Sequence, residues 1–125
     1  MNVVDSSGWI EFFQAGGNGP IFKPVIEARA LLLVPTIALF EVHKVLSRSL
    51  SEDLVTRCLD VMRLGRVLDL TDKRAIAASK AAGAHGLAFA DAAMYSMAQE
   101  HAAKFWTQDV DYDGLPGAMV FAKAG

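Results

Sequence analysis

Residues 31–46, LLLVPTIALFEVHKVL, decide the fold class of this chain. They begin with a wholly apolar run, residues 31–34, which is typical of a strand buried on both faces of a parallel sheet. Pro35 and Thr36 mark the junction to a helix that we predict over about residues 36–48. A buried strand that leads directly into a helix is the repeating unit of α/β proteins. The stretch therefore predicts a parallel sheet covered by helices.

The same alternation of short apolar runs and longer helical patterns continues on both sides of this stretch. Further strands are predicted at residues 2–5, 66–70, 104–107 and 118–121, and further helices at about 6–14, 22–30, 51–64, 72–84 and 89–101. Residues 16–20 read as a turn. The predicted helix caps are Ser6 or Ser7, Ser51 and Thr71. With 125 residues, the chain is expected to form a single domain over residues 1–125.

Composition limits the class of protein. A hydrophobic fraction of 53% and a charged fraction of 21% indicate a globular chain. The lone Cys58 excludes an intrachain disulfide, and we expect it to be a small core residue. The longest apolar run, residues 30–40, is interrupted by Pro35 and falls short of the roughly 20 residues that span a bilayer. Without a basic leader or disulfides, a cytoplasmic location is expected.

The charge balance bears on nucleic-acid binding. A net charge of −2 and a pI of about 5.8 argue against a protein that holds nucleic acid by its overall charge. They leave room for a metal-dependent nuclease, because metal-binding carboxylates lower the pI and bound cations reverse the local sign. His43, His85 and His101 show no zinc-ligand spacing, and no phosphate-binding glycine loop is present.

Two acidic residues interrupt apolar helical stripes. Glu41 shares a face with Ile37 and Val45, one turn before and after it. Asp91 shares a stripe with Met94, Tyr95, Ala98 and Ala102, whereas the polar face of its helix is expected at Ser96, Gln99 and Glu100. A carboxylate on a core-facing stripe is costly unless it is paired, hydrogen-bonded or metal-bound. In the simpler alternatives, Glu41 pairs with Lys44, and Asp91 complements the helix dipole.

Two further carboxylates follow predicted strands. Asp5 ends the first strand, and Asp109 follows the fourth in a loop that also holds Asp111 and Asp113. Sites in open α/β sheets lie just beyond the carboxyl ends of strands. The alternative reading is that these residues are caps and turn formers. Right-handed crossovers in a parallel sheet make it plausible that both meet Glu41 and Asp91 in space, although periodicity alone does not show it.

Four segments carry a family resemblance. They are VVDSS (3–7), PTIALFEV (35–42), LAFADAAMY (87–95) and WTQDVDY (106–112) followed by GLPG (114–117). In this order and spacing they resemble the PIN-domain family, and within it the VapC-type toxins of bacterial toxin–antitoxin pairs. The resemblance covers essentially the whole chain.

The resemblance implies a fold and a site. It implies a three-layer α/β/α sandwich with a central, mostly parallel sheet of four to five strands. It also implies that Mg²⁺ or Mn²⁺ binds an acidic pocket built from Asp5, Glu41, Asp91 and Asp109. Thr107 and Ser6 would lie near this metal site, and Asp111 or Asp113 would assist or replace Asp109. Carboxylate oxygens are the ligands that hard cations prefer.

The resemblance further implies an activity and partners. It points to a Mg²⁺-dependent endoribonuclease that leaves a 5′-phosphate and a 3′-hydroxyl, forms a homodimer and is inhibited by a small VapB-type antitoxin. A bound cation would lower the pKa of the attacking water and stabilise the leaving oxygen. Lys44 and Arg48 are expected either to hold flanking phosphates or to form a solvated face. The sequence does not indicate which RNA is cut.

Two alternatives of different kinds stay open at this point. One is a catalytically inactive PIN-like module that binds RNA or a partner protein. The other is a DNA or general single-strand nuclease without an antitoxin. Trp9, Phe12 and Phe13 lie at helical spacing and are expected in the core, with a partner surface as the alternative.

Overall fold

A single parallel sheet organises the chain. The computed structural model describes residues 1–123. Its strands are β1 (Asn2–Val4), β2 (Leu32–Pro35), β3 (Arg66–Leu68), β4 (Lys104–Thr107) and β5 (Ala118–Val120). They lie in the order β3-β2-β1-β4-β5, and every neighbouring pair is parallel. The expected sheet of four to five mostly parallel strands is therefore confirmed, with five strands and no antiparallel pair among them.

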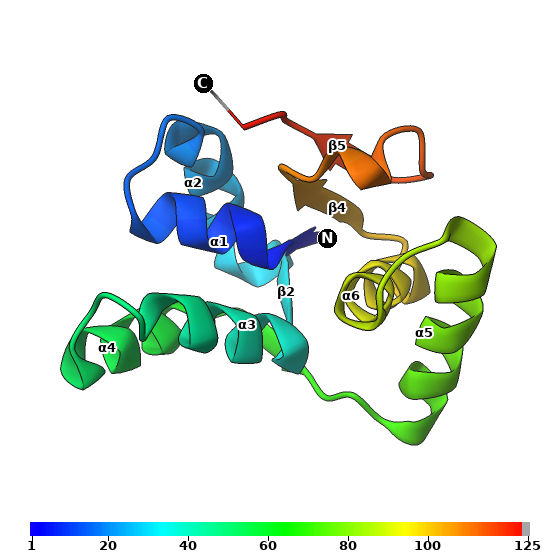
Figure 1. The fold of residues 1–125 in the computed structure, drawn as a ribbon, viewed down its shortest axis with the longest axis horizontal. Coiled ribbons are helices and arrows are strands. Elements are labelled where there is room, and N and C mark those ends of the chain that lie inside the picture. The colour runs from blue at the N-terminus through cyan, green and yellow to red at the C-terminus, as the bar shows by residue number, and fades with distance from the viewer. Residues whose placement is uncertain (124–125) are drawn as a thin grey trace.

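Helices cover both faces of the sheet. They are α1 (Ser6–Phe13), α2 (Gly19–Glu27), α3 (Thr36–Leu46), α4 (Glu52–Met62), α5 (Asp72–His85) and α6 (Phe89–Glu100), with short 3-10 helices at Arg29–Leu31 and Val110–Tyr112. In Figure 1, α1 to α4 lie to one side of the strands, and α5 and α6 lie to the other. This is the expected α/β/α arrangement of three layers. Within residues 1–123, no helix has the length and apolar character needed to cross a bilayer.

The strand order creates a switch point at the centre of the sheet. The chain starts in the middle with β1, moves outward through β2 to β3, and then returns to the other side with β4 and β5. The connection after β1 therefore leads to β2 on one side, and the connection after β4 leads to β5 on the opposite side. In open α/β sheets, such a point leaves a crevice beyond the carboxyl ends of the strands. Val4 of β1 pairs with Trp106 of β4, so Asp5 and Thr107, the next residues along, are neighbours at this edge of the sheet.

The core lies on both sides of β1 and β2, whose apolar side chains are buried. The helix α6 packs between the sheet and α5, and it is buried without interruption from Ala92 to Ala98. Ser96 was predicted on a polar face of this helix, and that prediction is wrong. Its side chain is buried, and its hydroxyl donates to the carbonyl oxygen of Ala93 at 3.1 Å. A helix enclosed on two sides has room for a polar face only at its end, where Gln99 and Glu100 are exposed.

The helix starts follow local hydrogen bonding. Ser51 and Thr71 are the caps of α4 and α5, as predicted, because their hydroxyls accept from backbone N–H groups three residues on. The cap of α1 is Asp5, not Ser6 or Ser7. Asp5 has extended backbone geometry, and its carboxylate accepts from the backbone N–H of Ser6 at 2.8 Å.

The start of α2 also differs from the prediction. Gly19 and Pro20 were expected in a turn, but they begin the helix. Proline is compatible with the first helical turn, because the backbone N–H that it lacks would have no partner there. Pro24 lies inside the same helix.

Candidate active site

Asp5 is the most deeply buried acidic residue at the carboxyl edge of the sheet, with 3% of its surface exposed. Its Oδ2 accepts a hydrogen bond from Thr107 Oγ1 at 2.7 Å and a longer one from Ser7 Oγ at 3.3 Å. Its Oδ1 accepts from the backbone N–H of Ser6 at 2.8 Å. Asp5 therefore caps α1, as the alternative interpretation has it, and it lies at the carboxyl edge of the sheet beside the switch point.

Burial leaves Asp5 poorly stabilised as an anion. Desolvation is the main reason that its pKa rises from 3.8 to about 6, and the negative charges of Asp91 and Glu41 add to this increase. The hydrogen bonds from Thr107 and Ser6 lower the pKa and offset the increase only in part. A carboxylate with these surroundings favours a bound proton or a bound cation.

Ser6 links two of the predicted site residues. Its Oγ donates to Glu41 Oε1 at 2.8 Å and lies 3.4 Å from Asp5 Oδ1. Glu41 projects from α3 and is half-buried. The alternative pairing of Glu41 with Lys44 does not form in this structure, where Lys44 is exposed. The hydroxyl of Ser6, at the start of α1, thus orients Glu41, and Lys44 on the same helix as Glu41 does not.

Asp91 lies in the first turn of α6 and is half-buried. Its pKa is raised, first by desolvation and then by the charges of Asp109, Glu41 and Asp111. The same residue raises the pKa of Asp5. Asp91 therefore interacts electrostatically with Glu41 of α3, with Asp109 and Asp111 of the loop after β4, and with Asp5, which follows β1.

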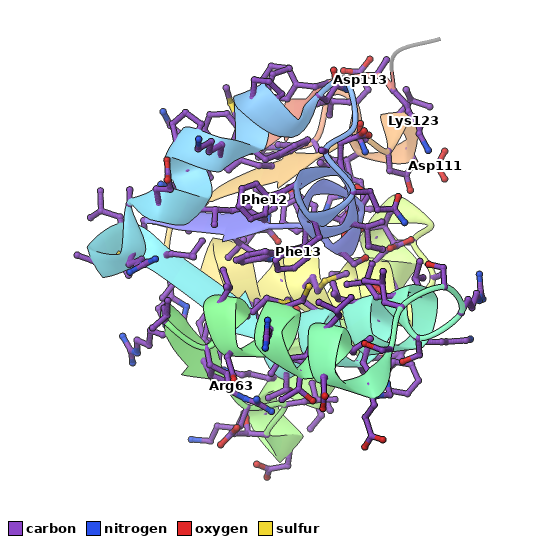
Figure 2. The ribbon with its side chains drawn as sticks, turned by 90° about the vertical axis from the view of Figure 1, so that its left-hand side faces the viewer. Phe12, Phe13, Arg63, Asp111, Asp113 and Lys123 are labelled. Atoms are coloured by element: carbon purple, nitrogen blue, oxygen red, sulfur yellow. The ribbon has the colours of Figure 1, made fainter. Side chains whose placement is uncertain are left out.

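Asp109 forms a turn and caps a helix, as the alternative interpretation of the acids in this loop predicts. Its Oδ1 accepts from the backbone N–H of Asp111 at 2.9 Å and caps the 3-10 helix Val110–Tyr112. Its own backbone N–H donates to Thr107 Oγ1 at 3.0 Å, so Thr107 connects this loop to Asp5. Asp111 and Asp113 are exposed, and Figure 2 shows both at one corner of the molecule, with Lys123.

No basic residue neutralises this group of acids within residues 1–123. The ion pairs of the described chain lie elsewhere, between Arg63 and Asp60, and around Glu100, which faces Arg74 and His101. Nor do any three His, Cys, Asp or Glu side chains in that part of the chain surround a common point as metal ligands do. Desolvation and the charges of the neighbouring acids raise the pKa values of Asp5 and Asp91. Hydrogen bonds, however, direct Glu41 towards Ser6 and Asp109 towards its own turn.

The donor set suits a hard divalent cation. Asp5, Glu41, Asp91 and Asp109 supply oxygen ligands only, and Mg²⁺ binds through one or two carboxylates while it keeps several waters. Two like charges about 4 Å apart repel by about 4 kcal/mol at an effective dielectric constant of 20. A cation among these residues would remove that repulsion.

Tyr112 belongs to this site, although the sequence analysis did not single it out. Its side chain is fully buried, and its hydroxyl has no hydrogen-bond partner of full geometry in the described structure. The phenol nevertheless lies close enough to Asp91 to lower the pKa of that carboxyl. An aromatic residue in a turn carries no periodic signal. The sequence indicated a link to the site only through the position of Tyr112 at the end of the segment 106–112, three residues after Asp109.

The sequence of the chain matches a protein-family model, the PIN domain, over residues 3–117. The matched range contains Asp5, Glu41, Asp91 and Asp109, and all of the helices and strands except the first residue of β1 and the strand β5. The chain belongs to the PIN-domain family. A search of curated protein sequences gave no significant match.

Solved structures of similar fold cover nearly the whole chain. A toxin–antitoxin complex from Klebsiella pneumoniae has a TM-score of 0.81 at 18% identity, covering 98% of this chain and 99% of that one. VapC20 from Mycobacterium tuberculosis, described as a toxin that cleaves the sarcin–ricin loop, has a TM-score of 0.71 at 16% identity, covering 97% and 89%. VapBC2 from Rickettsia felis, bound to a DNA fragment from its promoter, has a TM-score of 0.71 at 13% identity, covering 98% of each chain. At these identities the likeness establishes a shared fold.

Proposed function

We propose that this chain is a metal-dependent endoribonuclease and the toxin component of a VapBC-type pair. The observation that carries the proposal is the environment of Asp5. This carboxylate is buried at the switch point, has no basic partner within the described residues, and is repelled by Asp91 and Glu41. Such an arrangement destabilises the chain on its own, and a cation-binding site accounts for it. PIN-domain membership and VapC-type structural neighbours support the nuclease assignment.

In this proposal, Asp5, Glu41, Asp91 and Asp109 would hold Mg²⁺ or Mn²⁺. When bound, the cation would supply a water of lowered pKa and charge stabilisation for the leaving oxygen. Thr107 holds Asp5 by its 2.7 Å hydrogen bond, and Ser6 spans Asp5 and Glu41. These two hydroxyls orient the acids, and the exposed Asp111 adds negative charge near Asp91.

RNA would approach the exposed side of the acids. Lys44 and Arg48 lie on and just beyond α3, the helix of Glu41, and both are exposed. We assign them to the phosphates that flank the cut bond, where point charges position a strand without reading its sequence. An enzyme that acts on cellular RNA would work in the cytoplasm.

The proposed protein partner is a VapB-type antitoxin. Several of the similar structures are toxin–antitoxin complexes. The chain offers a cleft of about 490 Å³ between α1, α2 and α4, lined by Phe12, Phe13, Ile26, Glu27, Arg29, Leu54, Arg57, Cys58 and Val61. Trp9 is in the core as predicted, but Phe12 and Phe13 are only partly buried, and Figure 2 shows them near the middle of this face. Cys58 was expected inside the core, yet it is half-buried because it lines the cleft.

We also propose a homodimer. Phe40 of α3 and Phe89 of α6 are 67% and 61% exposed, and together with Thr36, Ile37, Leu70 and Ala90 they line one shallow pocket of about 350 Å³. Phe40 directly precedes Glu41, and Phe89 lies two residues before Asp91. A second copy on this apolar face would cover the flank of the acidic crevice. Sedimentation of the wild type and of Phe40→Ser tests this contact.

The test of the enzymatic proposal is RNA cleavage in Mn²⁺ or Mg²⁺, in EDTA, and with Asp5→Asn. Asp60→Asn is the matched control, because Asp60 is an exposed carboxylate that pairs with Arg63, far along the chain from the four acids. We expect cleavage by the wild type and the control in metal, and none by Asp5→Asn or in EDTA. Cleavage that survives both EDTA and Asp5→Asn would refute metal-dependent catalysis at this site. Growth arrest on expression, relieved by the neighbouring antitoxin gene, tests the toxin role.

A further inference from the structure

Tyr112 places a buried hydroxyl among the acids. It ends the 3-10 helix Val110–Tyr112, and its ring packs against Phe105 at 4.8 Å and Tyr95 at 6.0 Å between ring centroids. These contacts involve only the ring, so a phenylalanine would make them equally well. The hydroxyl is shielded from solvent and has no partner of full hydrogen-bond geometry.

A buried hydroxyl without a partner costs free energy, because it has lost its hydrogen bonds to water. Tyr95, in the same aromatic cluster, avoids this cost. Its hydroxyl donates to the carbonyl oxygen of Pro116 at 2.6 Å and accepts from Gln99 Nε2 at 3.3 Å. Hydrogen bonds to Pro116 and Gln99 therefore account for the hydroxyl of Tyr95, whereas no hydrogen bond within the described residues accounts for the hydroxyl of Tyr112.

The surroundings of Tyr112 favour a donor. The carboxylates of Asp5, Asp91 and Asp109 surround the phenol. A phenol carries its proton at neutral pH and can therefore donate a hydrogen bond. Tyr95, whose ring packs against Tyr112, lies one helical turn after Asp91 on α6, and Asp91 is the carboxyl whose pKa the phenol lowers. A hydrogen bond from a phenol to a charged carboxylate is stronger than one between neutral groups.

We propose that Tyr112 is a positioning residue, whose hydroxyl donates to one oxygen of Asp91 and turns the other oxygen towards the bound cation. A partner that holds the outer oxygen of a ligating carboxylate fixes its orientation and raises metal affinity. This inference rests on the proposed metal site and adds to it a residue outside the four acids.

The experiment compares Tyr112→Phe with Tyr95→Phe, two removals of one oxygen atom within one aromatic cluster. Free Mn²⁺ is counted by electron paramagnetic resonance during titration, and urea unfolding is followed in EDTA. We expect Tyr112→Phe to weaken Mn²⁺ binding by about tenfold or more, the loss of one hydrogen bond to a charged group. Its urea midpoint in EDTA should equal or exceed that of the wild type. Tyr95→Phe should lower the midpoint and leave Mn²⁺ binding unchanged.

A cleavage assay adds a second readout. In Tyr112→Phe, the Mn²⁺ concentration for half-maximal cleavage should rise about tenfold, while kcat at saturating Mn²⁺ changes less. Unchanged Mn²⁺ affinity in Tyr112→Phe would overturn the positioning role and leave the metal site intact. A drop in its urea midpoint like that of Tyr95→Phe would assign the hydroxyl to folding and also overturn the role. If the wild type binds Mn²⁺ no better than Asp5→Asn, the metal site and the positioning role both fail.

Discussion

Replacing Asp5 by Asn should stabilise the metal-free protein at neutral pH. Asp5 ionises with a pKa of about 6 in the folded chain and 3.8 in the unfolded chain. Between these values the folded state binds more protons, so the free energy of unfolding falls as pH rises. The penalty grows from about 1 kcal/mol at pH 4.5 to about 3 kcal/mol at pH 7.5, at 1.36 kcal/mol for each tenfold change. Asparagine has nearly the same shape and does not ionise.

The assay is urea unfolding in EDTA at pH 4.5 and pH 7.5. We expect Asp5→Asn to gain up to about 3 kcal/mol over the wild type at pH 7.5 and about 1 kcal/mol at pH 4.5. The amide cannot accept from both Ser6 and Thr107, which subtracts about 1 kcal/mol for the lost hydrogen bond at either pH. The difference between the two pH values, about 2 kcal/mol, is therefore the more reliable quantity.

Two results would refute this reasoning. If the gain of Asp5→Asn were the same at both pH values, Asp5 would not be the group whose ionisation is penalised. If the variant were less stable than the wild type at pH 7.5, its hydrogen bonds with Thr107 and Ser6 would outweigh the cost of its burial. Added Mn²⁺ should make the wild type more stable than Asp5→Asn at pH 7.5. A ligand that binds only the folded wild type stabilises it, and the stabilisation grows with the logarithm of the ligand concentration.

Three other substitutions test separate parts of the structure. Thr107→Val removes the donor that lowers the pKa of Asp5, so the Asp5 carboxyl should titrate above pH 6 in a ¹³C NMR titration of the metal-free protein; an unchanged titration would contradict the assigned hydrogen bond. Gly8→Ala places a Cβ 2.7 Å from Cγ1 of Val4 and 2.9 Å from the ring of Phe22 and should cost about 1–3 kcal/mol in urea unfolding; a neutral effect would mean that both side chains can shift without cost. Thr71→Ala removes the cap of α5 and should cost about 1 kcal/mol without changing cleavage; a loss of cleavage would show that α5 supports the site.

The sequence predicted the parts of the fold that depend on local patterns. The run 31–34 became the buried strand β2 with a shift of one residue, and Lys104–Thr107 was predicted with its observed bounds. Strands of a parallel sheet are buried on both faces and read as apolar runs, so they are visible in one sequence. Asp5 was found in the same way, because it directly follows such a run.

Features that depend on contacts between distant segments were harder to predict. The partner of Glu41 is Ser6 of α1, and the acids around Tyr112 include Asp5 after β1 and Asp91 of α6, and no spacing rule relates these residues. Ser96 was placed on the wrong face because periodicity reports polarity, whereas α6 is enclosed by the sheet and α5 together. The prediction that the four acids form one metal site remains a prediction, since their charges meet here without a shared ligand geometry.

The strand order has a consequence for synthesis on the ribosome. The central strand β1 is made first, but one of its two neighbours, β4, is made about a hundred residues later. A nascent chain that stops before β4 leaves one edge of β1 open and lacks the hydroxyl that holds Asp5. Pairings between such distant segments also form slowly, because a long loop must close first. Fragments released early from translation would therefore carry most of the acids and yet lack the assembled crevice.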